Sequence, residues 1–183
     1  MTRIAVVDPQ PAVRAGLTML LRTEPGLVPI GTATGVADGL ELVARLRPDV
    51  VLVDGDGLSL CRRLKALPEA PRVILYTGSP DVLLARIAGA DGVVDKADDP
   101  LDLFEAIRIV ARGGEALPPV DPEQLGEAAH LSDPEDLALL AMLVDGTPAP
   151  DAADALRLDR RKVGRRIERL LGRLRQSREP ALS

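Results

Sequence analysis

The chain has 183 residues, 46% of them hydrophobic and 28% charged, with a formal net charge of −5, which fits one α/β domain plus a smaller second domain. The lone Cys61 excludes a disulfide framework and a cysteine-rich zinc site, and the near absence of aromatic residues argues against a stacking platform for single-stranded nucleic acid. No apolar run approaches the roughly 20 residues of a membrane span and no signal-peptide pattern is present, so we expect a cytoplasmic protein that makes no membrane contact.

The first part of the chain alternates strand-like apolar runs with segments of helix length. Short connections join them, which implies a parallel sheet covered by helices on both faces. The right-handed crossover rule then favours a doubly wound, flavodoxin-like α/β fold with strand order 2-1-3-4-5. The expected strands are 4–7, 27–30, 50–53, 73–76 and 93–94, and the expected helices are 11–22, 36–46, 58–67, 82–88 and 101–111.

Polar residues follow four of these strands. Asp8 and Asp54 end the first and third strands, and Thr77 and Lys96 follow the fourth and fifth. Because the carboxyl ends of parallel strands share one edge of the sheet, we expect the four side chains to meet there. Two carboxylates suit a divalent cation, while a lysine and a threonine suit the oxygens of a phosphoryl group. Polar residues often end strands, and this alone would explain any one of these positions. It explains the occurrence of all four less well.

Proline and glycine recur before residue 131 without a sustained apolar period, which predicts a linker over 115–131. Ser132 and Glu135 have the spacing of a capping box and predict a helix that stops at Asp145 and Gly146. The apolar stripe expected on this helix consists of Leu137, Leu140, Ala141 and Val144.

Two short helices are predicted next, the first ending near Arg157 and the second capped by Asp159. A helix pair joined by a tight turn, with a basic second helix, is typical of a helix-turn-helix. The stripe expected to be buried in the second helix consists of Val163, Ile167, Leu170, Leu171 and Leu174.

The opposite face of this second helix is cationic. Residues 151–183 hold ten Arg and Lys against five Asp and Glu, a local charge of +5 that leaves −10 on the remainder. A row of arginines is often only the solvated side of a helix, but a cationic segment on an acidic body favours binding to a phosphate backbone. The residues expected to contact DNA are Arg161, Lys162, Arg165, Arg166, Arg169 and Arg173.

The strand-end set, together with the segments VVDPQPAVRAGL and GADGVVDKADDPLDLFEAIRIVARGG, resembles the receiver domain of LuxR/NarL-type bacterial response regulators. Residues 131–174 are similar to the helix-turn-helix of the same proteins. The resemblance implies that Asp54 is the phospho-acceptor and Asp8 a metal-site carboxylate, with Thr77 as the switch hydroxyl and Lys96 as the phosphate-contacting lysine. It implies a receiver-like domain at 1–114, the linker at 115–131, an all-α helix-turn-helix domain at 132–176 and a tail at 177–183.

Departures from the family pattern suggest an atypical receiver. Pro9 stands where receivers of this type carry a second acid, and the loop after Asp54 is short, with Asp56 as a substitute ligand. Aliphatic Val93 and Val94 replace the usual aromatic residue of the fifth strand. We therefore expect Mg²⁺ to bind weakly, no cofactor to be required, and control to depend weakly or not at all on phosphorylation.

The sequence thus predicts a transcriptional regulator that binds double-stranded DNA and is not an enzyme. A homodimer is expected to use the receiver-like domain, and no cognate histidine kinase is identified. One alternative is a phosphatase resembling the haloacid dehalogenases, with Asp54 as nucleophile and Asp56 as acid/base. Another is a pseudo-receiver whose acidic edge binds a small molecule or a protein partner.

Overall fold

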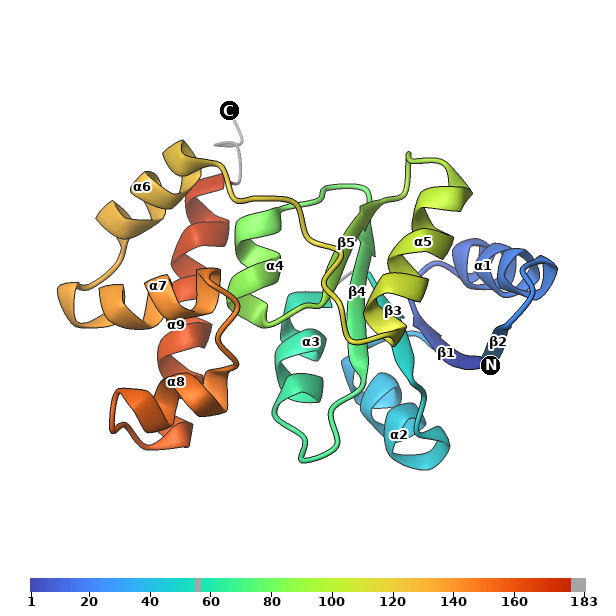
Figure 1. Ribbon diagram of the computed structural model, residues 1–183, viewed down its shortest axis with the longest axis horizontal. Coiled ribbons are helices and arrows are strands. Elements are labelled where there is room, and N and C mark those ends of the chain that lie inside the picture. Colours follow the sequence, from blue (N-terminus) through green and yellow to red (C-terminus); the bar gives the residue numbers. More distant parts are fainter. Residues whose placement is uncertain (55–56, 179–183) are drawn as a thin grey trace. The chain divides into compact units, whose positions relative to one another are not determined.

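The computed structural model describes residues 1–54 and 57–178 (Figure 1). The chain divides into two compact units. One comprises Met1–Asp81 with Ala90–Leu117, and the other comprises Val82–Gly89 with Pro118–Ser183. Asp56, the proposed substitute ligand, lies outside the described residues. Within the described ranges, no helix combines the length and the apolar character needed to cross a bilayer.

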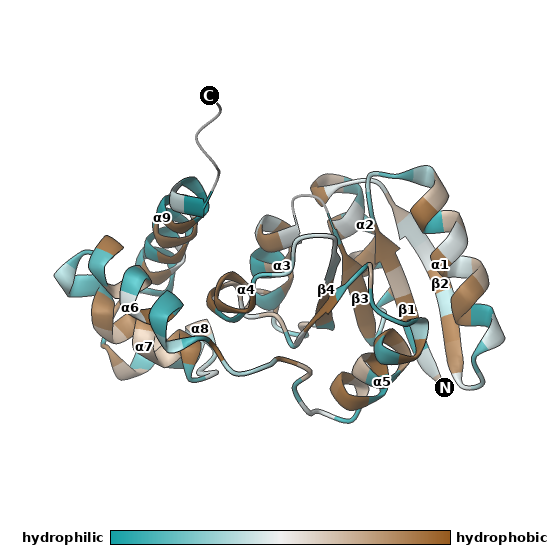
Figure 2. Ribbon diagram, turned by 90° about the horizontal axis from the view of Figure 1, so that it is seen from above, coloured by the Kyte–Doolittle hydropathy of each residue, from teal (hydrophilic) through white to brown (hydrophobic). Residues whose placement is uncertain are grey.

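The first unit is built on a parallel five-stranded sheet with the order β2-β1-β3-β4-β5, which confirms the predicted topology. All four residues of β3 are at most 1% exposed, as expected of a central strand covered on both faces (Figure 2). The strands are β1 (Thr2–Val7), β2 (Leu27–Ala33), β3 (Val50–Val53), β4 (Arg72–Thr77) and β5 (Gly92–Asp95).

Four helices of this unit cover the sheet, close to the predicted ranges: α1 (Pro11–Thr23), α2 (Val36–Leu46), α3 (Gly57–Lys65) and α5 (Pro100–Ala111). Leu21 of α1 and Ile107 of α5 share one core cluster with Ile4 of the central sheet. On α2, Gly39 lies so close to α3 that a Cβ built there would be 2.9 Å from Leu60 Cδ2. A larger residue at position 39 would therefore require the end of the Leu60 side chain to shift.

The segment after α5 returns along the outer side of β5. Ala116 N donates to Asp91 O at 2.8 Å, and Val93 N donates to Ala116 O at 3.1 Å. Ala116 thereby forms an isolated parallel bridge with Gly92. Residues 115–117, which we predicted to begin the linker, are thus part of the first unit.

The second unit contains α4 (Val82–Ala88), α6 (Pro122–Leu131), the 3₁₀ turn η1 (Pro134–Asp136), α7 (Leu137–Val144), α8 (Ala149–Ala155) and α9 (Arg160–Arg178). The helix α4 packs against α7 and α9. The helix α6 corrects the prediction of an irregular linker at 115–131. Asp121 caps it by accepting from Glu123 N at 2.9 Å, and its sole fully buried residue, Ala128, is too small to give a clear apolar period.

The predicted capping box before α7 was wrong. Ser132 Oγ donates to Ala128 O at 2.7 Å and so closes α6. The 3₁₀ turn then delays the start of α7 to Leu137, whose side chain is 41% exposed. The buried residues of α7 are Leu139, Leu140 and Leu143, so Leu140 is the one member of the predicted stripe that is buried.

Candidate functional site

An acidic pair lies at the carboxyl edge of the sheet, where β1 and β3 end side by side. Val7 pairs with Val53, so that Asp8 and Asp54 follow on neighbouring strands. The backbone extends the ladder by one residue, because Asp54 N donates to Val7 O at 2.9 Å. The side chain of Asp8 is 1% exposed and that of Asp54 is 17% exposed.

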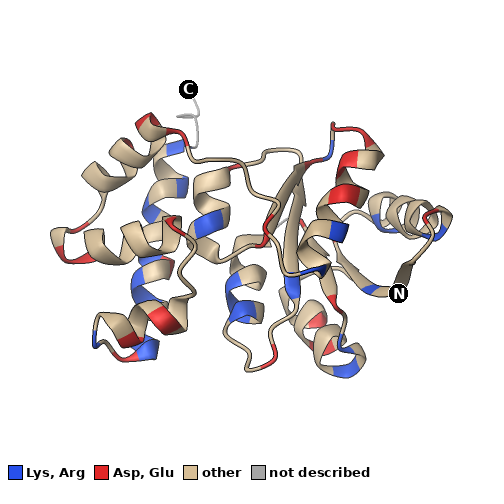
Figure 3. Ribbon diagram, in the orientation of Figure 1, with Lys and Arg blue, Asp and Glu red and all other residues tan. Residues whose placement is uncertain are grey.

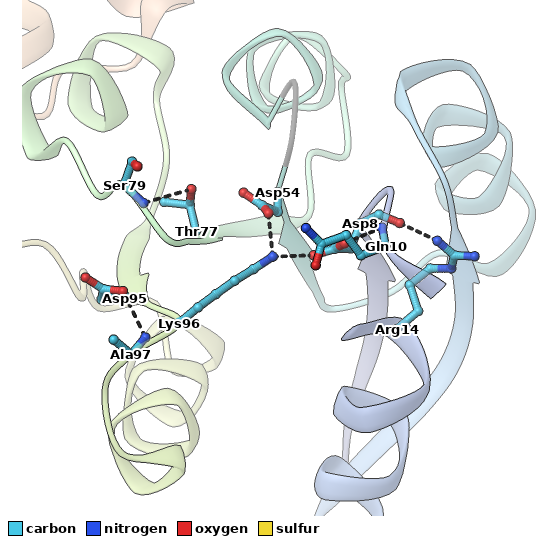
Figure 4. Close-up of polar contacts among 9 residues, drawn as sticks. All are labelled: Asp8, Gln10, Arg14, Asp54, Thr77, Ser79, Asp95, Lys96 and Ala97. Carbon is cyan, nitrogen blue, oxygen red and sulfur yellow. Dashed lines mark hydrogen bonds and ion pairs between the residues drawn. The ribbon is translucent and has the colours of Figure 1, made fainter. Parts of the chain in front are cut away.

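Lys96 joins the two carboxylates. Its backbone N donates to Thr77 O at 3.0 Å, which continues the pairing of β4 with β5. Its Nζ lies 2.7 Å from Asp8 Oδ2 and 2.5 Å from Asp54 Oδ2 (Figure 4). The structure therefore brings together three of the four predicted strand-end groups, with the ammonium between the acids.

The electrostatics of this cluster favour a charged lysine. Burial alone would lower the pKa of Lys96, but hydrogen bonds to Asp54 and Asp8 outweigh burial and raise the pKa above its ordinary value. Tyr76, a residue to which we gave no role from the sequence, has its ring centroid 6.0 Å from Lys96 Nζ. Burial raises the pKa of the Tyr76 phenol.

Asp8 is held in place by local contacts that sequence reasoning missed. Its Oδ1 accepts from Gln10 N at 2.7 Å, and its carbonyl accepts from Arg14 Nη1 at 2.6 Å. The first contact is an Asx turn, which the Asp8-Pro9 pair could have indicated. The fourth predicted group, Thr77, ends β4, and its Oγ1 accepts a long hydrogen bond of 3.4 Å from Ser79 N.

The described residues of this edge do not fit a metal site of the usual receiver kind. Within 1–54 and 57–178, no group of three or more His, Cys, Asp or Glu side chains could hold a metal ion. Asp8 and Asp54 offer carboxylate oxygens, but the Lys96 ammonium already contacts both carboxylates. A magnesium ion requires near-octahedral oxygen ligands and would have to displace this ammonium.

The second candidate site is α9, whose local structure matches the prediction. Asp159 caps the helix, since its Oδ1 accepts from Arg161 N at 2.9 Å and from Lys162 N at 3.1 Å. Arg157, in the turn after α8, has a φ of 53°, a left-handed conformation that few non-glycine residues adopt. All residues of the predicted stripe are buried: Val163, Ile167, Leu170, Leu171 and Leu174.

Basic positions recur along α9 (Figure 3), and the six predicted DNA contacts fall into two groups, those in ion pairs with acidic residues and those with exposed side chains. Arg166 forms ion pairs with Glu135 and Asp136, and Arg173 forms one with Asp133. Hydrogen bonding between Arg173 and Asp133 raises the pKa of the arginine and lowers the pKa of the aspartate. The other four predicted DNA contacts have exposed side chains: Arg161, Lys162, Arg165 and Arg169.

A hollow of about 660 Å³ opens on this face of α9. Five charged residues line it, namely Lys162, Arg165, Arg166, Glu168 and Arg169. Four of the five are cationic, so the hollow suits an anionic ligand such as a phosphate group.

Comparison with known proteins identifies the family. Residues 4–108 match the model of the response regulator receiver domain. The chain is 32% identical over 192 residues to the DNA-binding transcriptional activator DevR/DosR of Mycobacterium tuberculosis, an alignment that covers 95% of this chain and 88% of that protein. It is 30% identical over 189 residues to the nitrate/nitrite response regulator protein NarP of Escherichia coli, with 94% and 88% covered. The crystal structure of a LuxR-family two-component response regulator from Aurantimonas sp. SI85-9A1 matches with 29% identity and a TM-score of 0.60, over 65% of this chain and 91% of that chain. The chain therefore belongs to the response regulator family, in its LuxR/NarL group.

Proposed function

We propose that this protein is a transcriptional regulator that binds double-stranded DNA through α9. The observation that carries the proposal is the division of α9 into a buried apolar stripe and an exposed row of Arg161, Lys162, Arg165 and Arg169. A helix of this kind, preceded by a short helix and a tight turn, has the parts that enter the major groove in helix-turn-helix proteins. The relative named as a DNA-binding transcriptional activator supports the same function.

The proposal is tested by measuring affinity for duplex DNA as a function of salt. If each of the four exposed cations neutralises one phosphate, affinity falls roughly 100-fold between 50 and 200 mM salt. Selection from a random duplex pool then supplies the preferred sequence, and Arg165→Ala should relax that preference more than Arg173→Ala. Absence of duplex binding at low ionic strength contradicts the proposal.

We further infer that the receiver is atypical and that control depends weakly or not at all on phosphorylation of Asp54. Pro9 provides no carboxylate beside Asp8, and the loop sequence after Asp54 is short. A weak Mg²⁺ site and no required cofactor follow from these two features. The test is labelling with a small phosphodonor and Mg²⁺. Stoichiometric labelling that is abolished in Asp54→Asn overturns the inference.

The same protein is expected to form a homodimer through its receiver unit rather than through α9. Sedimentation of the full chain, without DNA and with the selected duplex, measures this directly. Repeating the DNA titration with and without phosphodonor tests both DNA binding and its dependence on phosphorylation. An enzymatic role is not part of the proposal, because the relatives are named as regulators.

A further inference from the structure

We infer that Arg166 is a positioning residue that fixes α9, and that DNA contact is left to Arg161, Lys162, Arg165 and Arg169. The inference rests on the proposed DNA binding and deepens it, because it separates basic residues that the sequence cannot distinguish. We call Arg166 with Glu135 and Asp136 the η1 clamp. It joins residues that lie about 30 positions apart and ties the start of α7 to the middle of α9.

Both terminal nitrogens of Arg166 are engaged by the clamp. Nη2 lies 3.0 Å from Glu135 Oε2, while Nη1 donates to Glu135 O at 3.2 Å and lies 3.2 Å from Asp136 Oδ1. The Arg166 side chain is only 16% exposed. A guanidinium held in this way cannot also pair with a base edge or a phosphate unless these contacts break.

Breaking the clamp would leave a buried carboxylate without its ion-pair partner. The Asp136 side chain is 6% exposed, and its Oδ1 makes no hydrogen bond of good geometry within the described residues. The carboxylate therefore depends on the nearby positive charge of Arg166. Removing one partner of a buried ion pair is strongly destabilising, because the other charge stays behind in a poorly solvated place. Arg166 is thus expected to remain in the clamp when DNA binds.

Arg173 differs from Arg166 although both lie on the side of α9 that meets acidic residues. Its pair with Asp133 joins side chains that are 44% and 40% exposed. Water solvates Asp133 when this pair opens, so a DNA phosphate could replace it at little cost. Among the six predicted DNA contacts on α9, the structure therefore distinguishes the fixed Arg166, the exchangeable Arg173 and four residues with exposed side chains.

The direction in which one substitution changes DNA affinity distinguishes a positioning role from a purely electrostatic one. Removing a negative charge beside a DNA-binding helix strengthens binding if the charge is only a bystander that repels phosphates. If Asp136 orients α9 through Arg166, then Asp136→Asn weakens binding even though it makes the unit more positive. Asp145→Asn is the matched control, because Asp145 is an exposed aspartate of the same unit that follows α7.

The experiment compares full-length wild type with Arg166→Ala, Asp136→Asn, Arg165→Ala and Asp145→Asn. Urea unfolding and anisotropy titrations of two duplexes are measured, one selected from a random pool and one of unselected sequence. We expect Arg166→Ala and Asp136→Asn each to lower the urea midpoint by roughly 1 M. Both variants should bind the two duplexes more weakly by the same factor, and the dependence of affinity on salt concentration should be unchanged.

The other two variants should behave differently. Arg165→Ala should keep the urea midpoint and lose preference for the selected duplex, and Asp145→Asn should leave stability unchanged without weakening binding. The double variant Arg166→Ala/Asp136→Asn should be no weaker than Arg166→Ala, because both changes remove one interaction. Should Arg166→Ala fail to fold, Arg166→Lys replaces it. A lysine keeps a phosphate contact but cannot span both acids, so the expected result is a lowered urea midpoint.

The results that overturn the inference are specific. One is tighter DNA binding by Asp136→Asn. Another is an Arg166→Ala variant with the wild-type urea midpoint and a salt slope reduced by about 1, the signature of a lost phosphate contact. Failure of the wild type to bind any duplex at low salt is a different outcome, since it removes the proposed function itself.

Discussion

Replacing Lys96 by methionine tests whether the lysine ammonium holds the acidic edge of the receiver together. Methionine keeps most of the length of the side chain and removes the charge. Asp8 and Asp54 then face each other without the cation that lies 2.7 Å and 2.5 Å from their oxygens in the wild type. The variant should fold less stably, and its stability should respond differently to pH and Mg²⁺.

The size of the effect follows from distance and burial. At about 2.6 Å and an effective dielectric constant of about 20, each contact is worth roughly 6 kcal/mol before desolvation. Desolvation cancels much of this, and losing one partner of a buried pair costs about 3–5 kcal/mol. Because the Lys96 and Asp54 side chains are 20% and 17% exposed, water compensates in part. We expect a loss near the lower limit, about 3 kcal/mol.

The assay is urea unfolding of both proteins between pH 7 and pH 12, with and without Mg²⁺. In the wild type the raised pKa of Lys96 contributes stability that is present below its ordinary value of 10.5 and is lost as pH rises through the raised value. In the methionine variant this loss is absent.

Magnesium provides the second sign test. With the ammonium removed, the carboxylate oxygens are available to a divalent cation, and binding to the folded state alone raises stability. Mg²⁺ should therefore stabilise Lys96→Met more than the wild type. Equal stability of the two proteins at pH 7, together with an equal response to Mg²⁺, would refute the view that Lys96 neutralises this edge.

Three further predictions concern single residues. Burial raises the pKa of the Cys61 thiol from its ordinary 9.0 to about 12, so the stability that it contributes is present below pH 9 and is lost toward pH 12. This amounts to about 4 kcal/mol, and Cys61→Ala should flatten that part of a pH–stability curve. Ile167→Ala, at a position 1% exposed, should lower the unfolding free energy by about 2–5 kcal/mol, and a loss below 1 kcal/mol in urea unfolding would argue against a packed stripe. Gly172→Ala should raise the thermal midpoint by adding about 0.4–1 kcal/mol, because no atom lies within 4 Å of a Cβ built there; a lower midpoint would contradict an open helical surface.

The parallel sheet was predictable because its central strand β3 is buried on both faces and reads as an unbroken apolar run. The segment 50–53 shows this most clearly, since nothing in it alternates with polar residues. The stripe of α9 was predictable for a related reason: large aliphatic residues at helical spacing leave one phase that buries them all. Both signals are local, so they survive without knowledge of the tertiary structure.

The missed features depend on contacts that local patterns do not contain. The helix α6 buries only Ala128 fully, and the turn η1 delays the start of α7 to Leu137. Arg165 and Arg166 are chemically identical neighbours, and only the fold places Glu135 beside the second of them. The four strand-end side chains were predicted to meet. The sequence did not indicate that the Lys96 ammonium would contact both carboxylates.

The bridge between Ala116 and Gly92 bears on how the edge of the sheet is protected from pairing with another molecule. An outermost strand presents unpaired amide and carbonyl groups that can recruit a strand from another molecule. The returning segment covers part of β5, with one hydrogen bond accepted and one donated by Ala116. A truncation after Arg112 would uncover that border and invite intermolecular β-pairing, whereas a truncation after Leu117 would leave it shielded.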